Sequence, residues 1–487
     1  MSRSDPSILA AASRLRGVTF HDVECGNVEG KGWGLTATKD LTTKDIKDAD
    51  TDQLPKLMSI PHDLVLNQQA VEEYAKECTE FKELYEAVGR QSPRRDVLLF
   101  LLVQLARGNP NLPSGTRIVS HSWTDYLKFL PEDVLVPTQW STDERKLLDG
   151  TSLKRAVTAK LSSLTSEFDY VFDKSCNMPF WYSVLWETET RRLQDWVMLD
   201  AWYRSRCLEL PRSGVSMVPY LDVVNHSREA TAYYDESAKD EVVLLLRPGV
   251  SVAKGEEITI SYGTVKPAAE MLFSYGFLEP AEKEKGGSLV LPFDADPDDP
   301  LARAKLVAFG ESPKVNVRVD QEGATTWECP FAYLACVNEE DGLEFKLLQD
   351  VEGNRELRVF WLEEDVTDRV KDFEAVIRCH PIYALVRLRA VTILQGCLED
   401  ELRQLHTPDF YDALSWNPAV RAHCKVAAAA LRDIEGGILE MAVAGMEEEK
   451  TALAADENVV AYFGSMEITE SDLVGDEAAN EEEDDFS

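Results

Sequence analysis

The stretch Tyr220-Leu221-Asp222-Val223-Val224-Asn225-His226-Ser227 places four polar residues in and directly behind an apolar run. The run Val218 to Val224 predicts a strand, so Asp222, Asn225 and His226 would meet at one end of a sheet. Taken alone, Asn-His-Ser is also a common turn with local side-chain hydrogen bonds. The sequence has no H-x-x-x-H pair and no G-x-S-x-G elbow, so neither a metal site nor a hydrolase is indicated.

A glycine-rich segment lies upstream, at Gly30-Lys31-Gly32-Trp33-Gly34. Alternating glycines allow a ligand to approach the backbone and leave N–H groups free to bind it. The spacing is not that of a dinucleotide-binding loop or a P-loop. When the segment is considered alone, an ordinary glycine-rich turn is the simpler interpretation.

A third segment lies downstream, at Glu256-Glu257-Ile258-Thr259-Ile260-Ser261-Tyr262-Gly263. A strand from Ile258 to Tyr262 would carry a phenol at its end. Tyr275-Gly276-Phe277 begins thirteen residues after Tyr262 and could form the wall of a narrow channel beside it. For Tyr275 or Phe277 taken singly, a buried core position is the simpler interpretation.

The rest of the chain predicts an α+β protein. Short strands are expected over residues 17–66, and apolar residues spaced three or four apart from Val71 to Val88 predict a helix face. Helical patterns continue to about Cys207, strands return between Pro211 and Pro280, and helices dominate again from about Pro300. The predicted parts are a β-rich domain in two pieces (17–66 and 209–282), a helical insert (67–208) and a mostly helical domain (295–447).

The 487 residues carry 51 Lys+Arg and 87 Asp+Glu, a net charge of −36. This balance argues against direct nucleic-acid binding, which needs a concentrated positive surface. Residues 451–487 hold 12 acidic residues and no Lys or Arg, and are expected to form a disordered acidic tail. The residues before 451 carry the remaining net charge of −24, which favours encounter with a basic partner.

The nine cysteines form no C-x-x-C or C-x-C pair, so no zinc cluster is indicated and reduced thiols are expected. No run of 18 apolar residues predicts a membrane span, and the first 17 residues lack the apolar core of a secretion signal. We therefore expect a monomer in the cytoplasm, the nucleus or both.

Taken together, the three segments in this order resemble the SET-domain family of S-adenosylmethionine-dependent methyltransferases. The helical insert and the helical C-terminal part resemble the subclass typified by Rubisco large-subunit lysine methyltransferase. The resemblance covers roughly residues 17 to 445. It implies a protein-lysine N-methyltransferase with a split SET domain, S-adenosylmethionine as cofactor and a C-terminal substrate-binding domain.

The resemblance also assigns roles to residues. The glycine motif would bind the methionine end of the cofactor, and Arg206 of the Ser205-Arg206 pair would bind its carboxylate, with Arg204 as the alternative. Tyr262 would stand at the point of methyl transfer. The full cofactor-binding set is Lys31, Trp33, Gly34, Leu35, Arg206, Asp222, Asn225, His226, Tyr262 and Phe277, and the substrate channel is assigned to Asp222, Tyr275 and Phe277.

Two features depart from the family pattern. Ala268 stands where this subclass commonly has an asparagine, and the cysteine-rich motif of many histone-directed members is absent. A non-histone, basic protein substrate that presents a lysine is therefore expected, with ribosomal or translation-associated proteins favoured by the resemblance. Protein-histidine methylation and a catalytically silent binding adaptor are the alternatives.

Overall fold

The computed structural model describes residues 12–44, 54–109, 117–187, 192–263, 266–279, 286–320, 322–349, 355–406 and 417–464. The chain forms two compact units. The first comprises Met1–Ser141, Arg155–Lys266 and Glu270–Phe277, and the second comprises Thr142–Lys154, Pro267–Ala269 and Leu278–Ser487. Each unit is described by itself.

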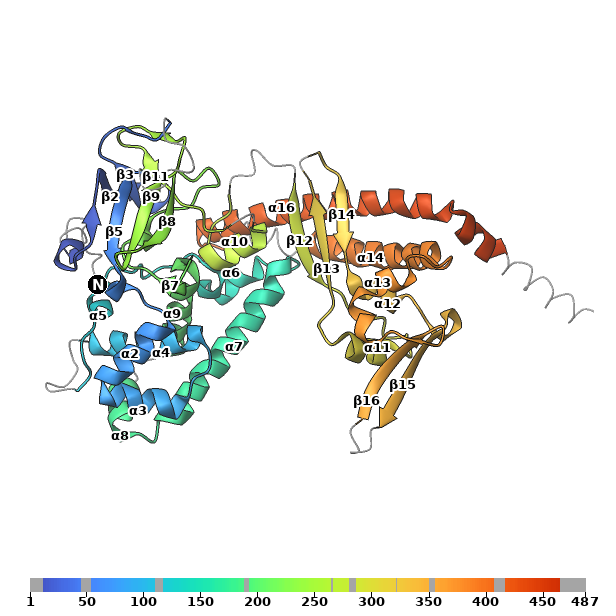
Figure 1. Ribbon diagram of the computed structural model, residues 1–487, viewed down its shortest axis with the longest axis horizontal. Coiled ribbons are helices and arrows are strands. Elements are labelled where there is room, and N and C mark those ends of the chain that lie inside the picture. The colour runs from blue at the N-terminus through green and yellow to red at the C-terminus, as the bar shows by residue number, and fades with distance from the viewer. Residues whose placement is uncertain are drawn as a thin grey trace, which may run out of the picture. The chain divides into compact units, whose positions relative to one another are not determined.

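The first unit is a β-rich domain whose strands come from both sides of the insert (Figure 1). One antiparallel sheet has the order β1-β5-β9-β8 and another the order β11-β3-β2, with the pairs β10-β4 and β6-β7 beside them. The strands are β1 Thr19–Phe20, β2 Val23–Val28, β3 Gly32–Ala37, β4 Leu41–Thr42, β5 Lys56–Pro61, β6 Cys207–Leu210, β7 Gly214–Met217, β8 Ala232–Ser237, β9 Glu241–Leu246, β10 Ser251–Val252 and β11 Glu257–Ile258. Because β5 pairs with β9 and β3 with β11, the two pieces form one domain.

Two predicted strands are shorter than expected or absent. The run Val218 to Val224 is not a strand, because β7 ends at Met217 and a 3-10 turn occupies Leu221–Val223. Tyr220 has φ 70° and ψ −30°, a conformation that an extended chain cannot adopt. The strand expected from Ile258 to Tyr262 ends as β11 at Ile258, after which Ile260 makes a single parallel bridge to His226.

The insert is helical as predicted, but one predicted helix is divided in two. The helices are α2 Gln68–Glu77, α3 Thr79–Val88, α4 Pro93–Arg107, α5 Ser122–Tyr126, α6 Thr142–Lys146, α7 Ser152–Ser175, α8 Pro179–Trp181 and α9 Leu193–Arg206. The helix face expected from Val71 to Val88 is split at Cys78, whose φ of −116° and ψ of 102° are extended. Helix α4 starts at Pro93, and its central residues are buried on all sides.

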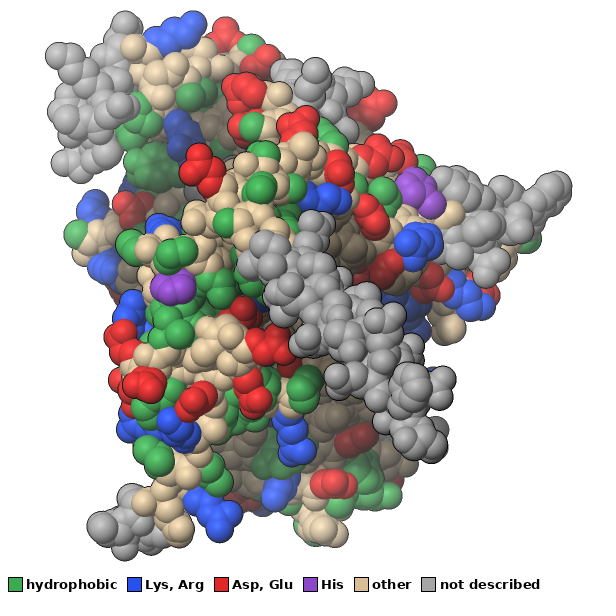
Figure 2. Space-filling view, turned by 90° about the vertical axis from the view of Figure 1, so that its right-hand side faces the viewer, with side chains coloured by type: hydrophobic (Ala, Val, Ile, Leu, Met, Phe, Trp, Pro, Cys, Tyr) green, Lys and Arg blue, Asp and Glu red, His purple; other side chains and the backbone are tan. Residues whose placement is uncertain are grey.

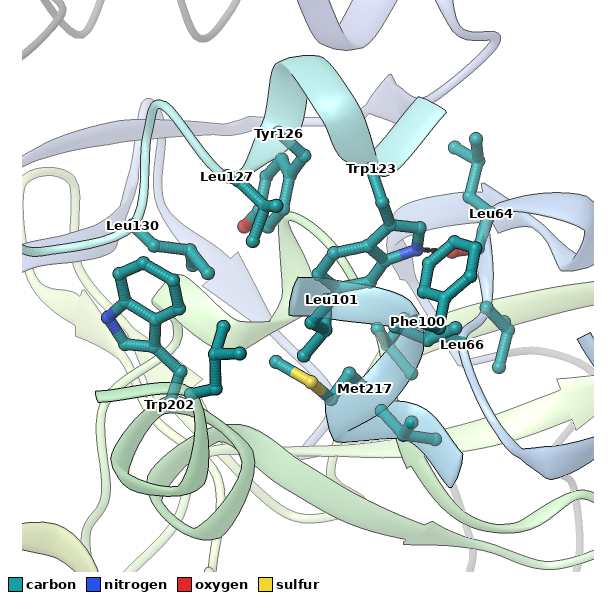
Figure 3. Close-up of a cluster of buried hydrophobic side chains, with 14 of the residues drawn as sticks. Leu64, Leu66, Phe100, Leu101, Trp123, Tyr126, Leu127, Leu130, Trp202 and Met217 are labelled. Carbon is teal, nitrogen blue, oxygen red and sulfur yellow. Dashed lines mark hydrogen bonds between the residues drawn. The ribbon is translucent and has the colours of Figure 1, made fainter. Parts of the chain in front are cut away.

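Insert helices and strands share one hydrophobic core (Figure 3). Trp123 from α5 is 1% exposed and donates from Nε1 to the Leu64 carbonyl at 3.0 Å. Leu101 of α4 and Met217 of β7 are buried in the same cluster. Burial of each such side chain contributes about 1.5–3 kcal/mol, so the insert and the sheets stabilise each other.

The second unit contains two antiparallel sheets that the sequence analysis did not predict. Their orders are β12-β13-β14 and β15-β16-β17. The strands are β12 Gly287–Pro292, β13 Lys314–Val319, β14 Thr325–Glu328, β15 Leu343–Gln349, β16 Arg355–Trp361 and β17 Glu364–Asp365. The helices are α10 Ala268–Tyr275, which starts in this unit and ends in the first, α11 Ala302–Phe309, α12 Pro330–Ala335, α13 Phe373–Ile377, α14 Tyr383–Leu405 and α16 Ala422–Ala454.

Residues 142–154 were expected in the insert but belong to the second unit. Glu144 is 2% exposed and accepts hydrogen bonds from the backbone N, Nε and Nη2 of Arg421 at 3.1, 2.7 and 2.9 Å. Glu435 of α16 accepts from the backbone N of Ser152 at 3.0 Å. These buried polar contacts account for the assignment, since such groups need their partners.

The acidic tail starts later than residue 451. Helix α16 continues to Ala454, residues 457–464 are helical, and Val459 is buried. Residues 465–487, which carry most of the acidic charge of the expected tail, lie outside the described residues.

No helix among the residues that the structure describes combines the length and the apolar character that crossing a bilayer needs. On the face shown in Figure 2, acidic side chains (red) and basic side chains (blue) are interspersed. On this face the negative charge of the described residues is thus distributed and not gathered in one patch.

We expect Arg421→Ala to lower the free energy of unfolding by about 3 kcal/mol, because it removes the guanidinium, with its charge and its two hydrogen bonds, from the buried Glu144 carboxylate. Arg403→Ala is the matched control, since it removes an exposed ion pair to Asp400 in α14 and should cost about 0.5 kcal/mol or less. Urea denaturation measures both, and equal losses would contradict the anchoring of residues 142–154 by Glu144.

Candidate functional site

Two segments, Asn225–Ser227 and Ile260–Tyr262, lie side by side and parallel at the centre of the candidate site. We call this contact the parallel crossing. The backbone N of Ile260 donates to the Asn225 carbonyl at 3.0 Å, and the backbone N of Ser227 donates to the Ile260 carbonyl at 3.1 Å. The backbone N of Tyr262 donates to Nδ1 of His226 at 3.1 Å. Desolvation lowers the pKa of His226, so its ring is neutral at pH 7 and its proton lies on Nε2.

The side chain of Asn225 links the glycine motif, Gly30 to Gly34, to the parallel crossing. Its Nδ2 donates to the Trp33 carbonyl at 3.0 Å and to Oε1 of Glu257 at 2.7 Å. Oε2 of Glu257 pairs with Nζ of Lys31 at 2.6 Å. Lys31, Trp33 and Asn225 are therefore brought together, with Glu257 as the group between them.

The contact between the glycine motif and Asn225 leaves no space for a side chain at Gly34. A Cβ atom there would be 2.5 Å from Cγ2 of Val28 and 2.9 Å from Nδ2 of Asn225. Leu35 is fully buried and pairs with Ile258 of β11, so its side chain packs in the hydrophobic core. The residue types at both positions thus follow from packing.

Asp222 joins three parts of the first unit. Nη1 of Arg206, the last residue of α9, donates to the backbone carbonyl of Asp222 at 3.0 Å and to Oδ2 at 2.9 Å. Tyr126 of α5 donates from its hydroxyl to Oδ1 and accepts from the backbone N of Tyr220 at 3.0 Å. Burial acts to lower the pKa of Arg206, but Asp222 outweighs it and the pKa is raised, so the guanidinium stays charged.

Arg206 has a buried donor that makes no hydrogen bond. Its Nε is buried and has no hydrogen-bond partner within the described part of the chain, although Nη1 is fully engaged by Asp222. Buried donors without a partner are rare in folded proteins. A fixed, charged guanidinium with a spare N–H is suited to binding a carboxylate.

Arg204 is not brought to this cluster. Its Nη1 donates to the Phe273 carbonyl, its Nη2 donates to Oγ1 of Thr138 at 2.8 Å, and its Nε lies 3.4 Å from Oδ2 of Asp200. Its Nε, like that of Arg206, has no hydrogen-bond partner among the described residues, but it faces Asp200 and not Asp222. The geometry therefore favours Arg206 over Arg204 for a ligand carboxylate. Arg204 instead anchors the helix that carries Tyr275.

Four rings, those of Tyr262, Tyr275, Phe277 and His226, lie next to one another beside the parallel crossing. The ring centroids of Tyr262 and Tyr275 are 4.8 Å apart, those of Tyr275 and Phe277 6.3 Å, and those of Phe277 and His226 6.1 Å. Tyr275 donates from its hydroxyl to the Tyr262 carbonyl at 3.2 Å, and Tyr262 donates to the Val224 carbonyl at 2.8 Å. Desolvation raises the pKa of both phenols, so both stay protonated near neutral pH.

A small cavity of about 10 Å³ opens between these groups. It is lined by Ser205, Arg206, Cys207, Leu208, Leu221, Asp222, Val224, Ile260, Tyr262 and Tyr275. This volume holds about one water molecule, so the cavity can receive only the end of a slender group. Four of the residues singled out from the sequence, Arg206, Asp222, Tyr262 and Tyr275, thus share one cavity.

The sequence analysis missed Tyr126 and Glu257 as members of the site. Glu257 lies inside the third quoted segment, and its position one residue before Ile258 could have indicated that it lies beside the glycine motif. Tyr126 has no comparable signal, because it contacts Tyr220 across 94 residues of chain. Among the described residues there is no group of three or more side chains suited to hold a metal ion.

Comparison with known proteins places this site in a family. No family model matches the sequence. The chain is 30% identical over 359 residues to SET domain-containing protein 8 of Schizosaccharomyces pombe, an alignment that covers 72% of this chain and 79% of that protein. It is 26% identical over 306 residues to the ribulose-1,5 bisphosphate carboxylase/oxygenase large subunit N-methyltransferase of Pisum sativum, covering 59% of this chain and about half (54%) of that enzyme.

The fold agrees with a solved structure of the same kind. The crystal structure of the SET domain of LSMT bound to lysine and AdoHcy superposes with a TM-score of 0.63 at 20% identity, covering 92% of both chains. The chain belongs to the SET-domain family of methyltransferases. Within that family it is similar to the Rubisco large-subunit N-methyltransferases, as the sequence motifs predicted.

We expect Gly34→Ala to lower the free energy of unfolding by about 1–3 kcal/mol, because the added methyl group overlaps Val28 and Asn225. Gly26→Ala is the control, since Gly26 pairs with Gly34 across β2 and β3 but has open space around its Cβ position. Thermal denaturation compares the two variants. A Gly34→Ala protein as stable as Gly26→Ala would show that the glycine motif and Asn225 are not in the contact described.

Proposed function

We propose that this chain is a protein-lysine N-methyltransferase that uses S-adenosylmethionine and acts on a non-histone protein. The observation that carries the proposal is the cavity that Arg206, Asp222, Tyr262 and Tyr275 share. Membership of the SET-domain family supports it, as do the activities for which relatives are named, which include a [fructose-bisphosphate aldolase]-lysine N-methyltransferase of Arabidopsis thaliana.

The residues present fit the cofactor. S-adenosylmethionine supplies a methyl group that its sulfonium makes electrophilic. The spare Nε of Arg206 is suited to the carboxylate of the cofactor, and the backbone of Trp33, Gly34 and Leu35 to its methionine end. The remaining binding groups that we assign are Lys31, Asp222, Asn225, His226, Tyr262 and Phe277.

The acceptor amine must arrive without a proton. A lysine has a pKa of about 10.4 in solution, and only the neutral amine has a lone pair to attack a methyl group. Phenol rings and apolar side chains line the cavity, and the charges of Arg206 and Asp222 balance each other, so desolvation disfavours the ammonium form there. We assign the walls of this channel to Tyr275, Phe277 and Asp222.

Tyr262 orients the acceptor and does not act as its base. Burial raises the pKa of its phenol, which therefore stays protonated at neutral pH. Its proton is donated to the Val224 carbonyl at 2.8 Å, which fixes the ring and leaves the phenol oxygen as an acceptor for an N–H group. Alignment of this kind supplies a large part of the barrier reduction in a displacement between two bound groups.

The substrate that we propose is a basic protein, with ribosomal and translation-associated proteins favoured. The net charge of −36, of which −24 lies before residue 451, favours encounter with a positively charged partner. We further propose that the protein acts as a monomer in the cytoplasm, the nucleus or both.

Isotope-labelled S-adenosylmethionine, added with the protein to a lysate from cells that lack it, should label a protein on lysine. Tyr262→Phe should lower the rate of labelling by about two orders of magnitude, the size typical of losing one polar group at a reacting centre. Tyr182→Phe, which removes a hydroxyl from an exposed side chain, should not change it. Mass spectrometry identifies the labelled residue. The absence of labelling, or full activity in Tyr262→Phe, would contradict the proposal. Label found on a histidine would show that histidine, and not lysine, is the acceptor.

A further inference from the structure

We propose that Tyr126, a residue of the helical insert, is a positioning residue that holds Asp222 and Arg206 in the geometry for binding the cofactor. The inference rests on the proposed function, because it assigns to Arg206 the carboxylate of S-adenosylmethionine. It goes further by making a helix outside the β-rich domain a determinant of cofactor affinity.

The contacts of the Tyr126 hydroxyl carry the inference. The hydroxyl donates to Oδ1 of Asp222 and accepts from the backbone N of Tyr220 at 3.0 Å. The other carboxylate oxygen, Oδ2, accepts from Nη1 of Arg206 at 2.9 Å. The side chain of Asp222 is only 3% exposed, so water cannot replace these partners freely. Tyr126 and Arg206 thus fix the two oxygens of one buried carboxylate.

The hydroxyl of Tyr126 also satisfies the backbone N–H of Tyr220, in the turn before Asp222. Tyr220 has a positive φ of 70°, which is strained for a residue with a side chain and persists only where surrounding contacts hold it. Its N–H is buried and finds its partner in Tyr126. The turn that presents Asp222 is therefore bonded to α5 through the phenol oxygen.

The ring of Tyr126 is fixed independently of its hydroxyl. Its centroid lies 5.2 Å from that of Trp123 and 5.1 Å from that of Tyr220, both edge to face. Figure 3 shows it packed with Trp123, Leu127 and Leu130 in the hydrophobic cluster. A phenylalanine at position 126 keeps this packing and removes only the two hydrogen bonds, which makes Tyr126→Phe an informative substitution.

Without the hydroxyl, Oδ1 of Asp222 and the N–H of Tyr220 lose their partner, and the carboxylate is free to turn away from Arg206. The guanidinium then loses its orientation toward the ligand. We expect the dissociation constant for S-adenosylmethionine to rise by about tenfold or more. The maximal rate at saturating cofactor should fall less than the affinity does, because Tyr126 does not line the cavity.

A double-mutant cycle on the full chain tests the inference by calorimetric titration with S-adenosylmethionine. Tyr126→Phe should weaken binding at least tenfold, as should Arg206→Lys, and the double variant should bind no more weakly than Arg206→Lys alone, because both changes remove one linked arrangement. Tyr74→Phe is the control, since Tyr74 is 2% exposed and donates to the Val119 carbonyl, away from Asp222. It should bind as the wild type does.

Unchanged binding in Tyr126→Phe, or fully additive losses in the double variant, would overturn the inference while leaving the proposed function intact. No binding by the wild type would contradict the proposed function itself. Asp222→Asn, which keeps the shape of the carboxylate, provides a second variant: we expect its loss of affinity to be at least tenfold and to become no larger when Tyr126→Phe is added.

Discussion

The parallel crossing of Asn225–Ser227 with Ile260–Tyr262 is the constraint on which the rest of the site depends. Two backbone hydrogen bonds and one bond to His226 hold the segments together. Asn225 then binds the Trp33 carbonyl across 192 residues of chain. One short crossing thus connects the glycine motif, the turn after Tyr220 and the end of β11, and it determines where Tyr262 is presented.

The helical insert completes the site by satisfying its buried charge. Arg206 forms an ion pair with the buried carboxylate of Asp222, and burying a carboxylate costs free energy unless its oxygens have partners. Tyr126 provides the partner for one carboxylate oxygen, and the core around Trp123 fixes Tyr126 in turn. The Nε of Arg206 is a buried donor that this arrangement leaves for a ligand. The insert therefore contributes to the chemistry as well as to stability.

The sequence predicted the family, because membership depends on local motifs whose order survives in the chain. Strands from both predicted pieces of the β-rich domain pair with each other, and four of the residues singled out from the motifs line one cavity. Strand boundaries were less predictable, since the positive φ of Tyr220 is imposed by contacts and not by residue type. The sheets of the second unit were overlooked although β13 alternates buried and exposed residues. The placement of residues 142–154 depends on Arg421 and Glu435, which lie almost 300 residues away and leave no local pattern.

Hydrogen exchange measured by mass spectrometry, with and without S-adenosylmethionine, tests most directly the claim that three distant segments build one cofactor site. We predict that the cofactor slows exchange together in peptides covering residues 31–36, 222–227 and 258–263, while the hairpin of β15 and β16 is unaffected. Ligand binding raises the free energy of opening of the segments it contacts. Protection that leaves out any one of the three segments, or that appears only in the second unit, would contradict the account.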